Sequence, residues 1–191
     1  MEHTHEERIG NYLIRIFPDS SPESPREWDN LGTMVCFHRR YDLGDKHDYC
    51  SGNYDGWEEM KEEIIKQENV HTILPLYLYD HSGITMNTTG FSCNWDSMRV
   101  GFIFVSKDKV KKEGVDESKV EQYLKGEVET YDQYLTGDVY GYKVYEVSEC
   151  DHGHEHKKEL DSCWGYYGEE DCMGEAKGMV EYYMKNEMEK V

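Results

Sequence analysis

The segment HTILPLYLYDHSGITMNTTGF, residues 71–91, contains two apolar stretches separated by a short polar one. Strand-forming residues stand on both sides of His81-Ser82-Gly83, a sequence typical of a turn. The segment therefore predicts two strands joined near these three residues. Pro75 cannot donate a ladder hydrogen bond, so we expect an edge position or a β-bulge there.

Further strands are predicted before and after this segment. We expect them at NYLIRIF (11–17), GTMVCFHRRY (32–41) and VGFIFVSK (100–107). The strands come in runs and do not alternate strictly with helices. This order favours an antiparallel or mixed sheet.

Three segments have the apolar spacing of amphipathic helices. Within residues 57–68 the apolar side chains fall at offsets 0, 3, 7 and 8, which is one face of a helix. Similar spacing predicts helices over residues 116–135 and 173–190. Since the chain has no internal repeat and no Gly/Ser linker, we predict one α+β domain over residues 1–191, with a flexible N-terminus at residues 1–10.

The charge of the chain is strongly acidic and unevenly distributed. Asp and Glu number 40 against 21 Lys and Arg, which gives a net charge of −19. Residues 113–191 carry 21 acidic and 8 basic side chains, or −13 of this total. Such a surface repels nucleic acids and anionic membranes and attracts basic partners or cations, although acidity also serves solubility alone.

Several common functional motifs are absent from the sequence. It has no GxGxxG, Walker A, HExxH or GxSxG motif and no EF-hand spacing. The basic clusters, at Arg39-Arg40 and between Lys107 and Lys112, are small, so direct nucleic-acid binding is not expected. No stretch approaches the roughly 18 apolar residues of a membrane span, and the N-terminus lacks a secretory signal. We therefore expect an intracellular protein with reduced cysteines.

The segment CDHGHEHKKELDSC, residues 150–163, is rich in metal-binding side chains. It lies between two stretches rich in Tyr, Val and Trp, which predict strands at about 142–149 and 160–167. We therefore expect residues 151–159 to form the exposed loop of a hairpin.

Two interpretations of this loop remain open. Alternate residues of an extended segment point the same way, so three imidazoles can converge on zinc, nickel or copper, with Cys150 or Cys163 as a fourth ligand. Alternatively, the loop is flexible and binds zinc or nickel only adventitiously, with no resident cofactor. We favour the second interpretation. The three candidate ligands are His152, His154 and His156.

A second set of polar residues is spread along the first half of the chain. Carboxylates and histidines at strand ends and in loops are typical of acid–base or metal chemistry. The same residues can also cap or order turns. The set contains Glu27, Asp29, Asn30, His38, Asp80, His81 and Asp96.

Several long segments resemble a family of phage- and prophage-encoded conserved proteins that have no established activity. The similarity covers most of residues 11–168 and brings no catalytic residues with it. The histidine tract falls between the similar segments. These segments are SPREWDNLGTMVCFHRRYDLGD, LPLYLYDHSGITM, VGFIFVSKDKV, YDQYLTGDVYGY and DSCWGYYG.

The resemblance implies a small phage accessory protein that acts in the cytoplasm of a bacterial host. Such proteins often disarm host defences, and an acidic inhibitor can occupy the basic nucleic-acid channel of a CRISPR effector or restriction enzyme. We therefore favour binding over catalysis and expect an anti-CRISPR or antirestriction-like DNA mimic. The candidate partner-binding residues are Glu169, Glu170, Asp171, Glu175 and Glu181.

Two alternatives remain open. The first is a small metal-dependent hydrolase or other enzyme built from Glu27, Asp29, His38, Asp80 and His81, which requires these side chains to converge in one pocket. The second is a scaffold or assembly factor, which predicts a homo-oligomer with an exposed apolar patch. The sequence does not indicate the oligomeric state.

Overall fold

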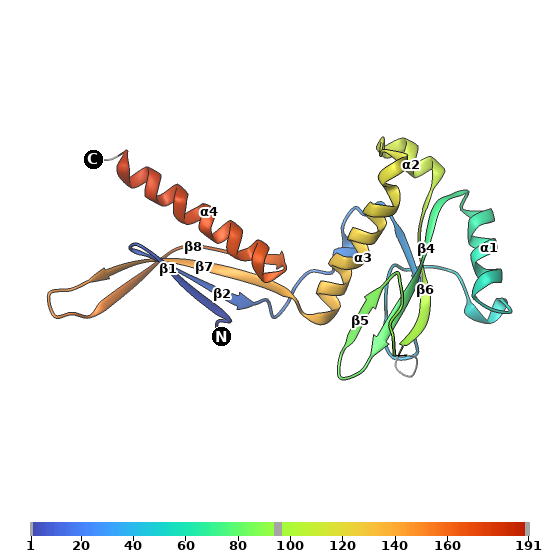
Figure 1. The fold of residues 1–191 in the computed structure, drawn as a ribbon, viewed down its shortest axis with the longest axis horizontal. Helices are drawn as coiled ribbons and strands as arrows, with labels where there is room; N and C mark the ends of the chain where they lie inside the picture. The colour runs from blue at the N-terminus through green and yellow to red at the C-terminus, as the bar shows by residue number, and fades with distance from the viewer. Residues whose placement is uncertain (1, 94–96, 190–191) are drawn as a thin grey trace. The chain divides into compact units, whose positions relative to one another are not determined.

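The computed structural model describes residues 2–93 and 97–189, and in it the chain forms two compact units. Unit 1 consists of residues 1–23 and 137–191, and unit 2 consists of residues 24–136. Each unit has its own four-stranded sheet, and every strand pair is antiparallel (Figure 1). The predicted α+β class with antiparallel pairing is thus confirmed. That the chain folds as one domain stays a prediction.

The sheet of unit 1 has the strand order β1-β2-β7-β8. Its strands are β1 (His5–Ile9), β2 (Tyr12–Pro18), β7 (Val139–Glu149) and β8 (Glu155–Tyr167). Helix α4 (Glu169–Met188) packs on one face of this sheet. Alternate residues of β2 and β7 point toward α4, as the two-residue period of a strand requires. The resulting core contains Tyr12, Ile14, Ile16, Tyr142, Val144, Cys172, Ala176 and Val180.

The sheet of unit 2 has the strand order β3-β6-β4-β5. Its strands are β3 (Thr33–Cys36), β6 (Ser97–Ser106), β4 (Val70–Asp80) and β5 (Ile84–Asn87). The β4–β5 connection at residues 81–83 is where the sequence predicts it. Pro75 pairs with Phe102 of β6 and with no residue of β5, and a register shift follows it between Leu76 and Tyr77, in line with the expected edge position or bulge.

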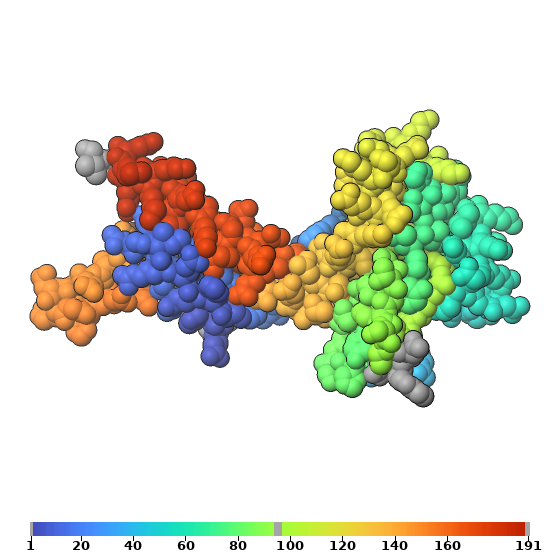
Figure 2. Space-filling model, in the orientation of Figure 1, coloured from blue at the N-terminus to red at the C-terminus, as the bar shows by residue number. Residues whose placement is uncertain are grey.

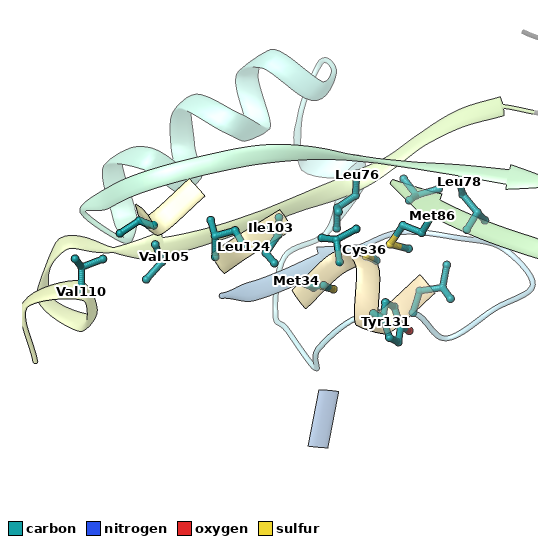
Figure 3. Close-up of a cluster of buried hydrophobic side chains, with 14 residues drawn as sticks. Met34, Cys36, Leu76, Leu78, Met86, Ile103, Val105, Val110, Leu124 and Tyr131 are labelled. Carbon is teal, nitrogen blue, oxygen red and sulfur yellow. The ribbon is translucent and has the colours of Figure 1, made fainter. Parts of the chain in front are cut away.

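Helices cover both faces of this second sheet. Helix α3 (Val120–Thr136) and α2 (Lys107–Glu113) contribute to the core on one face, and α1 (Trp57–Gln67) contributes to the core on the other. Figure 3 shows the first core, in which Leu124 and Tyr131 of α3 meet side chains from the strands. Short 3₁₀ turns are η1 (Pro25–Glu27), η2 (Ser51–Asn53) and η3 (Glu117–Lys119).

The structure corrects two predicted boundaries and adds one helix. Residues His5–Ile9, expected in a flexible N-terminus, form β1 because they pair with β2. The strand predicted over residues 32–41 ends at Cys36, where the chain leaves the sheet as a loop. Helix α2, which the sequence analysis missed, begins directly after β6 with Ser106 as its N-cap.

The hairpin around the histidine tract has a shorter loop than predicted. Strands β7 and β8 pair as far as Glu149 and Glu155, so the connection is the turn at residues 150–154. Residues 155–159 belong to β8, although their side chains are exposed. The prediction failed here because charged side chains are tolerated in a strand whose faces are both open to water.

Candidate functional site

A cavity of about 950 Å³ lies at one end of the unit 2 sheet. Its walls come from the loop after β3, the last residue of β4, the start of β6 and the first residue of α1. Two of the sequence-predicted residues, His38 and Asp80, line it together with the aromatic side chains of Phe37, Tyr41 and Trp57. A concave site with a few convergent polar groups is the usual place for a small ligand.

His38 and Asp80 are brought together by the fold. The His38 Nε2 lies 3.9 Å from Asp80 Oδ2, and both side chains are largely buried. The Nδ1 of His38 accepts hydrogen bonds from the backbone N–H groups of Arg40 and Tyr41, each at 3.3 Å. An Nδ1 that accepts carries no proton, so this geometry assigns the hydrogen of the neutral ring to Nε2, facing Asp80.

The Asp80 carboxylate also accepts a hydrogen bond from the guanidinium of Arg40. This bond raises the pKa of Arg40 above its ordinary value. The ring of Tyr41 stacks on that of His38 with centroids 4.9 Å apart. Together these contacts hold the loop that follows β3, so His38 and Asp80 have a structural role whatever else they do.

The remaining cavity residues offer little nucleophilic chemistry. Burial, with a smaller contribution from the charge of Asp45, raises the pKa of the Cys36 thiol to about 12, so Cys36 is not a thiolate near neutral pH. Ser51 also lines the cavity, but it forms no hydrogen bond with His38 within the described chain. The lone pair of His38 Nδ1 is already occupied by backbone donors. The geometry therefore suits binding better than nucleophilic catalysis.

Glu27, Asp29 and His81 do not join this pair. Glu27 ends η1 and Asp29 lies in the connection to β3; we call residues 25–32 the η1 loop. Both side chains are exposed and line a different cleft, beside Arg26 and Asp45. His81 is exposed in the β4–β5 turn. Asn30 uses its side-chain amide to order the η1 loop, and Asp96 lies outside the described residues. Only two of the five proposed catalytic residues, His38 and Asp80, thus line this cavity.

A buried ion-pair network, which the sequence analysis missed, fixes the η1 loop. The side chain of Arg26 is only 5% exposed, and its guanidinium donates to Asp45 at 2.7 Å and to Glu127 at 3.1 Å. Burial acts to lower the pKa of Arg26, but the hydrogen bonds and charges of Asp45 and Glu127 outweigh it and raise that pKa. The Glu127 carboxylate also accepts the backbone N–H groups of Leu31 and Gly32. No local pattern signals this network, because its members are far apart in the chain.

The structure does not group the three histidines of the tract, all of which lie among the described residues. His152 and His154 lie in the turn and only His156 lies in β8, so the alternation expected of an extended segment does not apply. Within residues 2–93 and 97–189, no three His, Cys, Asp or Glu side chains are grouped to hold a metal ion. Backbone N–H groups of His152 and His154 instead donate to the thiol of Cys150 and lower its pKa.

The acidic candidates on α4 fall into two groups. Glu169 is partly buried and accepts a hydrogen bond from Thr4 Oγ1 at 3.1 Å, so it does not belong to the open surface. Glu170, Asp171, Glu175 and Glu181 are exposed, and none of the described residues forms an ion pair or hydrogen bond with their carboxylates. We call these four residues the α4 acidic face.

Comparisons with family models, curated proteins and solved structures found no significant match. The functional argument for this chain therefore rests on its own residues. Within the part of the chain that the structure describes, no helix has both the length and the apolar character needed to cross a membrane.

Proposed function

We propose that the protein is a binding protein that covers a basic, nucleic-acid-binding surface of a bacterial host protein with its α4 acidic face. In this proposal it acts as a phage counter-defence inhibitor of the anti-CRISPR or antirestriction type. The observation that carries the proposal is the set of four exposed carboxylates on one side of α4 that lack ion-pair partners among the described residues.

The spacing of these residues supports a continuous surface. With 3.6 residues per turn, Glu170, Asp171 and Glu181 lie on the side of α4 away from the buried Cys172, Ala176 and Val180, and Glu175 lies at the flank of this side. Helix α4, coloured red, lies at the surface of unit 1 in Figure 2. Exposed carboxylates on a helix match in sign the phosphates that a basic channel binds.

Part of this acidity also has a structural explanation. Gly168, the N-cap of α4, has no side chain to satisfy the first backbone N–H groups. Acidic residues in the first turn stabilise the positive end of the helix dipole, which accounts for Glu170 and Asp171. Glu175 and Glu181 lie beyond that turn, so the helix dipole does not account for them.

Two glycines on the same side of α4 support the idea of a contact surface. Gly174 and Gly178 are exposed, and a Cβ added at either would meet no heavy atom within 4 Å. A glycine inside a helix costs about 1 kcal/mol relative to alanine. Without side chains at these two positions, a partner can pack closely against the helix backbone.

The proposal is tested by competition with nucleic acid. Purified, nucleic-acid-free CRISPR effectors and restriction enzymes are mixed with the protein, and their binding to labelled duplex DNA is measured. We expect the protein to displace DNA from at least one of them, with an affinity that falls roughly tenfold or more between low and high salt. The double variant Glu175→Lys/Glu181→Lys should abolish the displacement.

A matched control separates this surface from net charge. The variant Asp48→Lys/Glu62→Lys changes the net charge equally at two exposed positions of unit 2. It should compete as well as the natural protein. If both double variants lose competition equally, the effect belongs to overall charge, and the α4 proposal is wrong.

A second candidate function is supported by the approach of His38 to Asp80 in the cavity of unit 2. An imidazole and a carboxylate in a pocket can serve acid–base chemistry or hold a metal ion. This candidate predicts turnover of generic ester or phosphodiester substrates with added divalent metals, reduced at least roughly 100-fold by Asp80→Asn. Absence of turnover across such a panel, or turnover unchanged by the variant, counts against it.

A further inference from the structure

A cleft of about 570 Å³ in unit 2 runs between α3 and the η1 loop. Tyr123 lines the cleft from α3 and Trp28 lines it from the η1 loop; these residues are 49% and 44% exposed. Gly126 also lines it, one helical turn after Tyr123. A Cβ added at Gly126 would meet no heavy atom within 4 Å, so the floor of the cleft is open.

The open floor is maintained at a cost to stability. Gly126 lies in the interior of α3, where alanine would favour the helix more than glycine does. Tyrosine and tryptophan are the residues most often responsible for binding energy at protein interfaces. Two such side chains beside an open floor are what a docking site for a partner side chain requires.

The wall opposite α3 is held in place before any partner binds. The side-chain amide of Asn30 donates to the carbonyls of Pro25 and Trp28, at 2.8 and 2.9 Å. Lys109 Nζ donates to the carbonyl of Asn30 at 2.5 Å. The ion pairs of Arg26 with Asp45 and Glu127 hold the same loop. A wall that is already ordered lowers the entropy cost of binding.

The charge around the cleft is acidic. Glu27 and Asp29 flank Trp28 in the chain, and Glu129 lines the cleft from α3. No described residue pairs with these three carboxylates, and Lys119 is the basic side chain among the lining residues. Aromatic rings bordered by carboxylates attract a cation, through the ring faces and through charge-assisted hydrogen bonds.

We propose that this cleft binds an arginine side chain presented by a partner protein. A guanidinium is planar and weakly hydrated, so it can stack on Tyr123 and Trp28 while donating to Glu129, whereas the ammonium of lysine stacks poorly and stays hydrated. The proposal rests on unit 2 alone and is independent of the α4 acidic face.

The site is tested by NMR titration of the isotope-labelled full chain with a blocked Gly-Arg-Gly-Arg-Gly peptide and its lysine analogue. We expect saturable shifts of the Trp28 indole N–H and of the Gly126 and Thr130 amides. Binding of the lysine peptide should be at least roughly threefold weaker. Tyr123→Ala should weaken binding of the arginine peptide at least roughly fivefold. Gly126→Leu, which fills the floor of the cleft, should weaken this binding by a similar factor.

Two controls keep the result interpretable. Tyr182→Ala removes a tyrosine of similar exposure from α4, and Glu175→Lys/Glu181→Lys changes the α4 acidic face; both should leave the shifts unchanged. Equal binding of both peptides, shifts spread over the whole acidic surface, or insensitivity to Tyr123→Ala would each overturn the proposal. Binding of free arginine amide as tightly as the peptide would assign the cleft to a small guanidinium ligand and overturn protein docking.

Discussion

The guanidinium Nη1 of Arg26 lies 3.1 Å from a carboxylate oxygen of Glu127, which stands 101 positions later in the chain. The same carboxylate accepts the backbone N–H groups of Leu31 and Gly32. One side chain of α3 thus satisfies a buried cation and two loop amides. This contact connects the exposed loop that carries Glu27 and Asp29 to the rest of unit 2.

Replacing Glu127 with alanine should therefore destabilise the protein strongly. The variant leaves Arg26 buried with one partner fewer and removes the acceptor of two backbone donors, so we expect a loss of about 3 kcal/mol in the free energy of unfolding. Urea denaturation measures this loss. Glu121→Ala, which removes an exposed pair with Lys125 on the same helix, should change stability by less than about 0.5 kcal/mol. Similar values for the two variants would contradict the structural role of Glu127.

A side chain at position 141 should disrupt the unit 1 sheet. The indole ring of Trp164 in β8 lies over Gly141 in β7, and a Cβ at Gly141 would stand 2.2 Å from Trp164 Cε3. Because the ring must move, we expect Gly141→Ala to cost about 2 kcal/mol in the free energy of unfolding. In the control Gly178→Ala the new methyl group meets open space, so we expect a gain of about 0.5–1 kcal/mol. An unchanged free energy of unfolding in Gly141→Ala would show that this contact is not close in solution.

The histidine tract should tolerate complete replacement. His152, His154 and His156 are exposed, and within the described residues they belong to no group that could hold a metal ion. The triple alanine variant should therefore melt at the same temperature as the natural protein, in chelator and in zinc alike. Differential scanning calorimetry measures both samples. A zinc-dependent rise in melting temperature that the variant lacks would identify the tract as a specific metal site.

Cys150 should react faster with alkylating agents than the exposed Cys50. Backbone N–H groups of His152 and His154 stabilise its thiolate and lower its pKa, so a larger fraction is ionised at a given pH below the ordinary value. The rate of alkylation of Cys150 should rise with pH and level off at a lower pH than that of a free cysteine. Mass spectrometry after brief iodoacetamide treatment gives both rates, and Cys150→Ser confirms the assignment. Equal rates at the two cysteines would show that the turn does not stabilise the thiolate.

The sequence by itself determined most of the secondary structure. The hairpin at residues 71–91, the amphipathic helix that begins at Trp57 and the C-terminal helix all appear close to their predicted places. These elements could be predicted because their patterns are local. The two-residue period of a strand, the 3.6-residue period of a helix and the turn residues each lie within one short segment. Where the faces of a strand are polar, as in residues 155–159, this signal disappears and the boundary was missed.

Only the tertiary structure decided which polar residues work together. His38 meets Asp80 because the end of β3 and the end of β4 lie at the same end of one sheet, whereas Glu27, Asp29 and His81 lie elsewhere. The Arg26–Glu127 contact and the cleft beside Tyr123 likewise join segments about 100 positions apart. No periodicity encodes such pairs, since long-range contacts depend on how the sheets and helices pack. The chain's acidity could be counted from the sequence, but the separation of Glu169 from the α4 acidic face required the packed helix.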